Sequence, residues 1–274
     1  MVAPVLLLLV AVALIPLLMI ALLTFHRFST ATGIEPVFSL QNWREICTDP
    51  YYAEMFLRTF RIASIVTAVS CLIGAPEAYI IHRMRPPWKG TFLVIALGPL
   101  LISVVARTLG WALLFGGANG VINKLLISLR LISAPLPFMF TEAGVVIALV
   151  HVLAPFVVLS VWAVLQRLDP QIENAAASLG ASQATILWRI VLPQALPGIL
   201  SGGIITFALA ASAFATPAII GGRRLKVAST LAYDEFLNTL NWPLGAAVAV
   251  LLLVAIATVV IGCSRLVERQ YPAV

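Results

Sequence analysis

Six apolar runs alternate with shorter polar stretches along this chain of 274 residues. The runs cover residues 4–25, 61–81, 91–115, 142–165, 198–221 and 244–264. Each run is about as long as a helix that crosses a lipid bilayer. A helix is the expected structure because it satisfies every backbone hydrogen bond within its own segment. The pattern predicts an all-α integral membrane protein with six transmembrane helices, in a single domain over residues 1–274.

The first run raises one alternative, a cleaved signal peptide. Such a peptide would have a basic segment, a shorter apolar core and a small-residue cleavage site. The run that begins at Pro4 lacks these features, so an uncleaved first helix is favoured.

Three connecting segments carry structural signals of their own. Residues 26–60 are expected to form an extramembrane loop with short helices, and Val121–Leu131 a short interfacial helix. Residues 82–90 are short, basic and free of acidic residues, which is typical of a cytoplasmic loop.

Composition supports a membrane protein. Hydrophobic residues make up 61% of the chain and charged residues 10%, and the mean hydropathy is +1.05. An average soluble domain has about 25% charged residues. The net charge of +6 is small for a nucleic-acid binder, so we expect membrane lipid and no nucleic acid around the chain. The three cysteines, Cys47, Cys71 and Cys263, have no metal-binding spacing and are expected to be ordinary buried thiols.

The most informative polar stretch lies between the fourth and fifth runs. Asp169 can cap a helix at its N-terminus, and Gly180 lies where a helix end requires a left-handed residue. Ser182 can cap a second short helix over residues 183–191, which Leu192-Pro193 would end. The stretch therefore predicts two short helices joined by a sharp glycine turn.

The first of these helices has one face suited to docking. Ile172, Ala175, Ala176 and Leu179 recur at helical spacing and share that face. Because its middle residues are small, another surface can approach it closely.

The same stretch resembles the EAA loop of ABC importer permeases. Glu173, Ala176, Gly180, Ile190 and Leu192-Pro193 match the family pattern, and Asn174 stands where the second acidic residue is most common. In that family the loop faces the cytoplasm and inserts its short helix into a cleft of the ATPase subunit. The resemblance thus implies a cytoplasmic coupling loop over residues 166–197. It assigns ATPase coupling to Ile172, Glu173, Asn174, Ala175, Ala176, Leu179, Gly180, Ile190 and Pro193.

Other segments extend the resemblance over nearly the whole chain. Residues 120–126, Arg107-Thr108 with Trp111, residues 215–222 and residues 241–247 are similar to segments of spermidine/putrescine-type permeases. The resemblance implies the MetI-like permease fold in the bacterial inner membrane, with both termini in the cytoplasm and a polyamine-like solute. The implied partners are an ABC ATPase dimer, a second homologous permease and an extracytoplasmic substrate-binding protein.

Charge alone does not set the orientation. The loops on the two sides hold nearly equal numbers of Lys and Arg, although positive charge normally gathers in the cytoplasmic loops. The orientation therefore rests on the resemblance.

Polar residues in or near the apolar runs are the candidates for a solute pathway: Glu77, Arg107, Glu142, His151 and Ser212. Three of them have a second interpretation. Glu77 can be an interfacial group, the Arg107 side chain can extend to an interface, and His151 can bond to a neighbouring helix. The small residues of the fifth run indicate a subunit interface or a pathway wall, and Pro217 is expected to kink its outer end.

The sequence lacks a Walker motif and every familiar catalytic motif. We therefore expect a transport subunit without an ATPase site or cofactor of its own, with ATP and Mg²⁺ bound by the partner ATPase. The main alternative is a secondary transporter or channel, which would carry paired ionisable groups within the membrane. A non-transporting scaffold would not need the polar loop.

Overall fold

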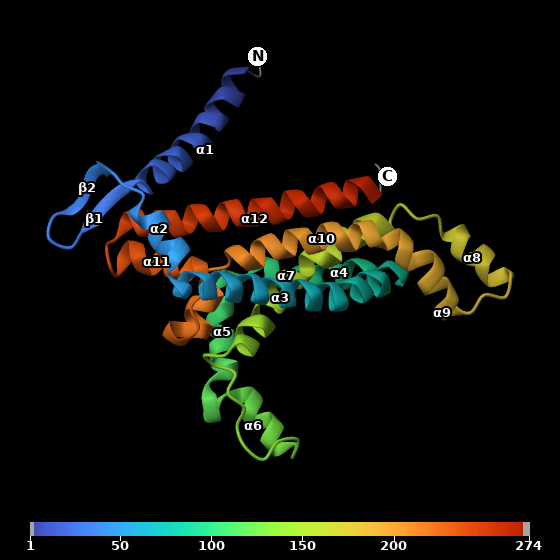
Figure 1. Ribbon diagram of the computed structural model, residues 1–274. Coiled ribbons are helices and arrows are strands. Elements are labelled where there is room, and N and C mark those ends of the chain that lie inside the picture. Colours follow the sequence, from blue (N-terminus) through green and yellow to red (C-terminus); the bar gives the residue numbers. More distant parts are fainter. Residues whose placement is uncertain (1–2, 271–274) are drawn as a thin grey trace. The chain divides into compact units, whose positions relative to one another are not determined.

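The computed structural model describes residues 3–270 and is predominantly helical (Figure 1). Its contacts divide the chain into two compact units. The first unit comprises the residues up to Phe60 together with Lys226–Thr258, and the second comprises Arg61–Leu225 and the residues from Val259 onward. Helices α3 (Pro50–Arg83) and α12 (Trp242–Gln270) each contribute to both units. The single transmembrane domain stays a prediction.

Four helices within residues 3–270 are long and apolar enough to cross a membrane: α3, α7 (Glu142–Leu165), the helix Gln183–Ser212, and α12. A fifth candidate is the pair α4 (Trp88–Leu101) and α5 (Val104–Phe115), which are bent by 94° at a short break. Val10–Leu23, within α1 (Ala3–Leu23), is a shorter apolar helix. These elements are compatible with the six expected spans, and the first span stays a prediction.

The third expected span is interrupted between α4 and α5. Gly98 and Pro99 lie inside α4, and the chain leaves the helix at Ile102 and Ser103, which have extended backbone angles. Between α5 and α7 lie η1 (Gly117–Asn119) and α6 (Val121–Ser128). Helix α6 forms most of the expected interfacial helix.

In the first unit, residues 26–60 differ from the expected loop with short helices. They contain a β-hairpin, β1 (His26–Ser29) paired antiparallel with β2 (Gly33–Phe38), before α2 (Gln41–Thr48) and the start of α3. Gly33 allows the hairpin turn because its φ is +79°, a value that side chains disfavour. The core of this unit consists of Ile46, Tyr52, Met55, Leu231, Ala232, Leu244, Ala247 and Val248.

The segment before α12 also contains regular structure. After η4 (Gly222–Arg224), residues Ala228–Leu237 form α11. Lys226 Nζ lies 2.7 Å from Asp234 Oδ2, so an ion pair joins α11 to the chain that precedes it. The hydrogen bond to Asp234 raises the pKa of Lys226.

The second unit is built on the close packing of α7 against α10 (Leu192–Ser212). Gly198 and Gly202 lie one turn apart on α10 and face α7. A Cβ atom at Gly202 would lie 2.9 Å from the Val157 Cα, and one at Gly198 would lie 2.9 Å from the Val161 Cα. These glycines let the two backbones approach, as small residues do in membrane helix pairs. They are therefore used within the chain and not at a subunit interface.

The coupling loop continues into the fifth span without the expected helix end at Leu192-Pro193. After α8 (Pro170–Ser178) and α9 (Gln183–Ile186), residues Leu187–Val191 form a π-turn, η2, which leads directly into α10. Pro193 has no N–H to offer the carbonyl group of Arg189. The wider turn, in which the Leu192 N–H bonds to the Leu187 carbonyl group, carries the helix past this missing bond.

At its other end, α10 stops earlier than expected. The chain is non-helical at Ala213 and Phe214, before the π-turn η3 (Pro217–Gly221). Pro217 cannot donate a hydrogen bond to the Ala213 carbonyl group, so the irregularity falls four residues before the proline. The core beneath the coupling loop consists of Ala78, Ile81, Val157, Val158, Val161, Leu165, Ile186, Val191 and Ala195.

Candidate functional site

The caps predicted for the coupling loop are confirmed. Asp169 Oδ1 accepts a hydrogen bond from the Gln171 N–H (2.9 Å), and Ser182 Oγ accepts one from the Thr185 N–H (3.2 Å). Gly180 has a φ of +86°, and the Ala181 N–H bonds back to the Ala176 carbonyl group (3.1 Å). This is a Schellman-type helix end, in which the last carbonyl groups of α8 find partners.

The predicted docking face of α8 is divided in two. Ile172, Ala175 and Leu179 are exposed, and Leu179 keeps 89% of its surface accessible. Ala176 is half-buried and packs against the core beneath the loop. Asn174 is exposed alongside the first three residues. The outward side of α8 therefore presents Ile172, Ala175 and the prominent Leu179, with the polar Asn174 beside them.

Glu173 points the other way. Its exposed fraction is 9%, and its Oε2 atom lies 2.7 Å from Arg83 Nη1, at the end of α3. The Tyr79 hydroxyl group donates a longer hydrogen bond of 3.5 Å to the same oxygen. The carboxylate that the sequence assigned to ATPase coupling is thus held inside the chain.

The remaining two residues of the expected coupling set lie further along the helix. Ile190 is half-buried in η2 and packs against the core beneath the loop. Pro193 is exposed in the first turn of α10.

Arg107, the charged residue expected within the third span, is buried with an exposed fraction of 8%. Its Nη1 atom donates a hydrogen bond to the Pro99 carbonyl group, in the last turn of α4. A cation at this position offsets the negative end of the helix dipole. Arg107 therefore stabilises the break between α4 and α5 and does not extend to an interface.

Two other pathway candidates have partners on neighbouring helices. His151 Nδ1, on α7, accepts a hydrogen bond of 3.1 Å from the Trp111 Nε1–H on α5. Glu142, the first residue of α7, forms an ion pair with Arg61 on α3. The interpretation of His151 as a residue bonded to a neighbouring helix is confirmed.

The last two pathway candidates, Glu77 and Ser212, lie on α3 and at the end of α10. Glu77 is half-buried on α3, and Ser212 is exposed, with its hydroxyl group bonded to the Ala208 carbonyl group of its own helix. A cavity of about 340 Å³ lies beside both helix breaks, and among residues 3–270 only Arg107 of the five candidates lines it. The structure does not bring the five candidates together in one site.

Residues 1–271 match the family described as "binding-protein-dependent transport system inner membrane component". The chain belongs to this family. It is the permease subunit of an ABC importer, a multi-pass protein of the inner membrane, and it is not the subunit that hydrolyses ATP.

Two relatives agree with this assignment. The permease is 30% identical over 253 residues to the spermidine/putrescine transport system permease protein PotB of Escherichia coli strain K12, covering 92% of this chain and 90% of PotB. It is also 30% identical over 217 residues to the molybdenum transport system permease protein ModB of Mycobacterium tuberculosis, covering 79% and 80% of the two chains.

Solved structures show the same fold. A bacterial ABC transporter that imports the acidic polysaccharide alginate matches with a TM-score of 0.76 at 17% identity, over 98% of the permease and 93% of that chain. The inward-facing MetNI methionine ABC transporter matches with a TM-score of 0.61 at 18% identity, over 81% and 99% of the two chains. The predicted MetI-like fold is confirmed.

The sequence analysis missed the two partners of Glu173, Tyr79 and Arg83. They are four residues apart, so they lie on one face of α3. Arg83 and Glu173 are 90 residues apart in the sequence, so no local pattern links them. Arg83 lies in the basic loop of residues 82–90, which has no acidic residue, but that pattern predicted only a cytoplasmic location.

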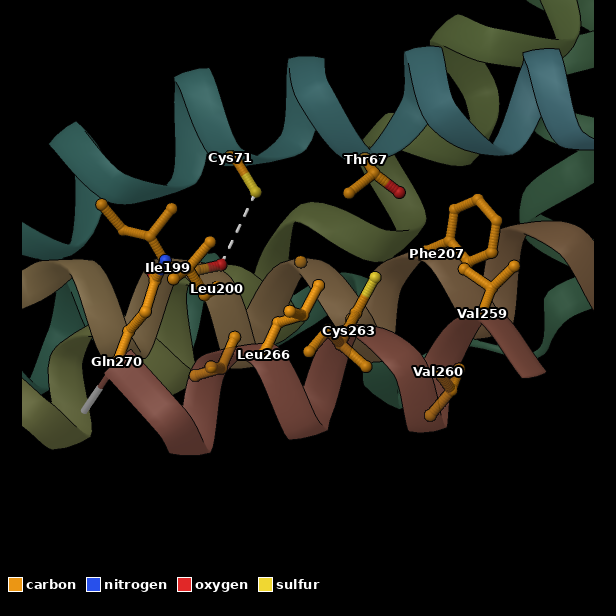
Figure 2. Close-up of a pocket in the computed structure, with 13 residues that line it drawn as sticks. Thr67, Cys71, Ile199, Leu200, Phe207, Val259, Val260, Cys263, Leu266 and Gln270 are labelled. Carbon is orange, nitrogen blue, oxygen red and sulfur yellow. Dashed lines mark hydrogen bonds between the residues drawn. The ribbon is translucent and has the colours of Figure 1, made fainter. Parts of the chain in front are cut away.

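The cysteines are less buried than expected. Cys47 and Cys263 are exposed in the isolated chain, and Cys71 is half-buried. Figure 2 shows Cys71 and Cys263 on the wall of an apolar cavity of about 520 Å³, lined by α3, α10 and the last part of α12. The Cys71 thiol group makes a weak hydrogen bond of 3.8 Å to the Ile199 carbonyl group.

Proposed function

We propose that the permease receives energy from an ABC ATPase dimer through the outward face of α8. The observation that carries this proposal is Leu179, a large apolar residue that is 89% exposed at the C-cap of the short helix α8. Ile172 and Ala175 extend the same exposed surface. Apolar surface of this kind on an extramembrane loop is typical of a site for another protein.

The ATPase would bind ATP and Mg²⁺ and close on them, and α8 would move with it. Nucleotide can shift the permease between inward- and outward-open states only through a difference in affinity for those states. The similarity to MetNI, described as a methionine ABC transporter, supports this arrangement.

We propose two further partners. A second, homologous permease would complete the pathway, with membrane lipid around the pair. An extracytoplasmic binding protein would deliver the solute; an alginate ABC transporter with a TM-score of 0.71 is described in complex with an alginate-bound periplasmic protein.

The candidate solute is polyamine-like, because relatives at 28% to 30% identity are named spermidine/putrescine permeases. Arg107 does not argue against a cationic solute. Its guanidinium group is buried and engaged by the Pro99 carbonyl group, so the charge is partly offset by the helix end.

Purification of the tagged permease from native membranes tests the energy source. We expect a nucleotide-binding subunit to co-purify with it and to hydrolyse ATP. Repeated isolation of a transport-competent permease without any nucleotide-binding subunit would instead support the secondary transporter or channel.

The proposed orientation places both termini and the α8 loop in the cytoplasm. A Ser182→Cys variant, in a background with the three native cysteines replaced by serine, should react with a membrane-impermeant maleimide only after the cells are opened. Ser182 is exposed, so access does not limit the reaction. Labelling in intact spheroplasts would reverse the orientation.

A further inference from the structure

Besides the packing of Ala176 against the core beneath the loop, helix α8 is attached to the rest of the second unit in three ways. The chain enters it at Asp169 and leaves it through the Gly180 turn, and these two connections are covalent. The third connection is the contact of Glu173 with α3. This third connection is independent of α7 and α10, the helices that the loop joins.

In the contact of Glu173 with α3, two side chains donate hydrogen bonds to one carboxylate oxygen. Tyr79 and Arg83 lie one helical turn apart on α3, so both reach the same Glu173 oxygen. An Arg–carboxylate contact of 2.7 Å is a charge-assisted hydrogen bond, which is stronger than a neutral one. Glu173 also lies in the first turn of α8, where the helix dipole favours a negative charge.

Burial differs between the two partners. The Glu173 side chain is 11% exposed, whereas that of Arg83 is 48% exposed. The carboxylate has therefore lost most of its contact with water and depends on α3 for compensation. If α8 moved away alone, the carboxylate would lose its charge-assisted hydrogen bond to Arg83, so movement of α8 together with the end of α3 is favoured.

We propose that Tyr79 and Arg83 form a clamp that holds Glu173 and makes the Arg83 end of α3 move with α8 when the ATPase closes. Arg83 is a positioning residue in this role, since it acts through Glu173 and touches neither solute nor nucleotide. The clamp gives the ATPase a route into the second span in addition to the covalent route into the fifth. It rests on the proposed docking of α8.

Charge reversal tests the contact. We compare Arg83→Glu, Glu173→Arg and the double exchange in the assembled complex, reconstituted in lipid nanodiscs, by binding-protein-stimulated ATP hydrolysis. We expect the rate of ATP hydrolysis to fall about tenfold in each single variant, as for the loss of a charged hydrogen bond. The double exchange should restore most of that rate. Arg85→Glu is the matched control, with the same charge change two residues away in the same basic loop. It should remain at the wild-type level.

A distance measurement separates positioning from a general structural role. In the cysteine-free background, spin labels at Ile80→Cys on α3 and Ser178→Cys on α8 occupy exposed positions. We expect double electron–electron resonance to give one narrow distance that stays the same with and without ATP and vanadate. Adding Arg83→Gln should broaden this distance and make it change when nucleotide is trapped.

The outcomes separate the two proposals. If Arg83→Glu hydrolyses ATP like Arg85→Glu, or if the wild-type distance changes on trapping as much as in Arg83→Gln, the clamp is wrong. A loss in Arg83→Glu that the exchange does not regain, with an unchanged distance in Arg83→Gln, also overturns it. Failure of the wild-type permease to bind any ATPase would instead overturn the docking of α8.

Discussion

Replacing Gly180 with Val is expected to abolish coupling of ATP hydrolysis to transport while leaving the permease in the membrane. The residue has a φ of +86°, a conformation that costs an L-residue about 1–2 kcal/mol and a β-branched residue more. A Cβ atom there would meet no atom within 4 Å, so the penalty comes from the backbone alone. Relief of that strain would reorient α8 and its exposed Leu179. We expect at least a tenfold loss of binding-protein-stimulated ATP hydrolysis in the assembled complex.

Two controls isolate the cause. Gly180→Asn should retain most of the activity, because Asn accepts the left-handed conformation better than other side chains do. Gly33→Val places the same side chain at the hairpin glycine, whose φ is +79° and which also has open space around it, far along the chain from the loop. It should leave coupling intact. Normal coupling in Gly180→Val would remove the main support for α8 as the docking element.

Replacing Gly202 with Ala is expected to lower the amount of folded permease in the membrane. The added Cβ atom would lie 2.9 Å from the Val157 Cα and 3.0 Å from the Ser160 Cβ, so the backbones of α7 and α10 would have to separate. Overpacking of this kind costs roughly 1–3 kcal/mol. Membrane levels and the melting temperature in detergent, followed by fluorescence-detected size-exclusion chromatography, measure the effect.

The next residue supplies the matched control. A Cβ atom at Gly203 would lie 3.3 Å from the Cys71 Sγ and 3.6 Å from the Thr67 Cγ2, beside the 520 Å³ cavity shown in Figure 2. These are ends of side chains that can move, so Gly203→Ala should stay close to wild type. Helix propensity favours Ala over Gly at both positions. Equal losses in the two variants would therefore show that the contact with α7 does not set the cost.

The sequence predicted the features of the coupling loop that depend on neighbouring residues. Asp169, Gly180 and Ser182 act as expected because a helix cap involves residues only two to five positions apart. Most of the membrane helices were also predictable, since an apolar run and the bilayer thickness together set a length.

The features that depend on distant residues were not predictable. The split of the α8 face arises from the core beneath it and from the contact of Glu173 with Arg83. Likewise, a small residue in the fifth run can face α7 or a second subunit, and only the packing of α10 showed that Gly198 and Gly202 face α7. The hairpin over residues 26–38 was missed because its short strands give a weak periodic signal.

The π-turn at Leu187–Val191 has a mechanical consequence. It keeps α9 and α10 in one continuous helix of 30 residues, Gln183–Ser212, which changes direction between the two elements (Figure 1). The α10 part has 21 residues and, at 1.5 Å per residue, is a lever about 31 Å long, whose far end shifts about 3 Å for a tilt of about 5°. The lever ends at Ala213 and Phe214, where the helix is interrupted. A small rotation imposed beside the Gly180 turn is therefore delivered, enlarged, to the cavity beside Arg107.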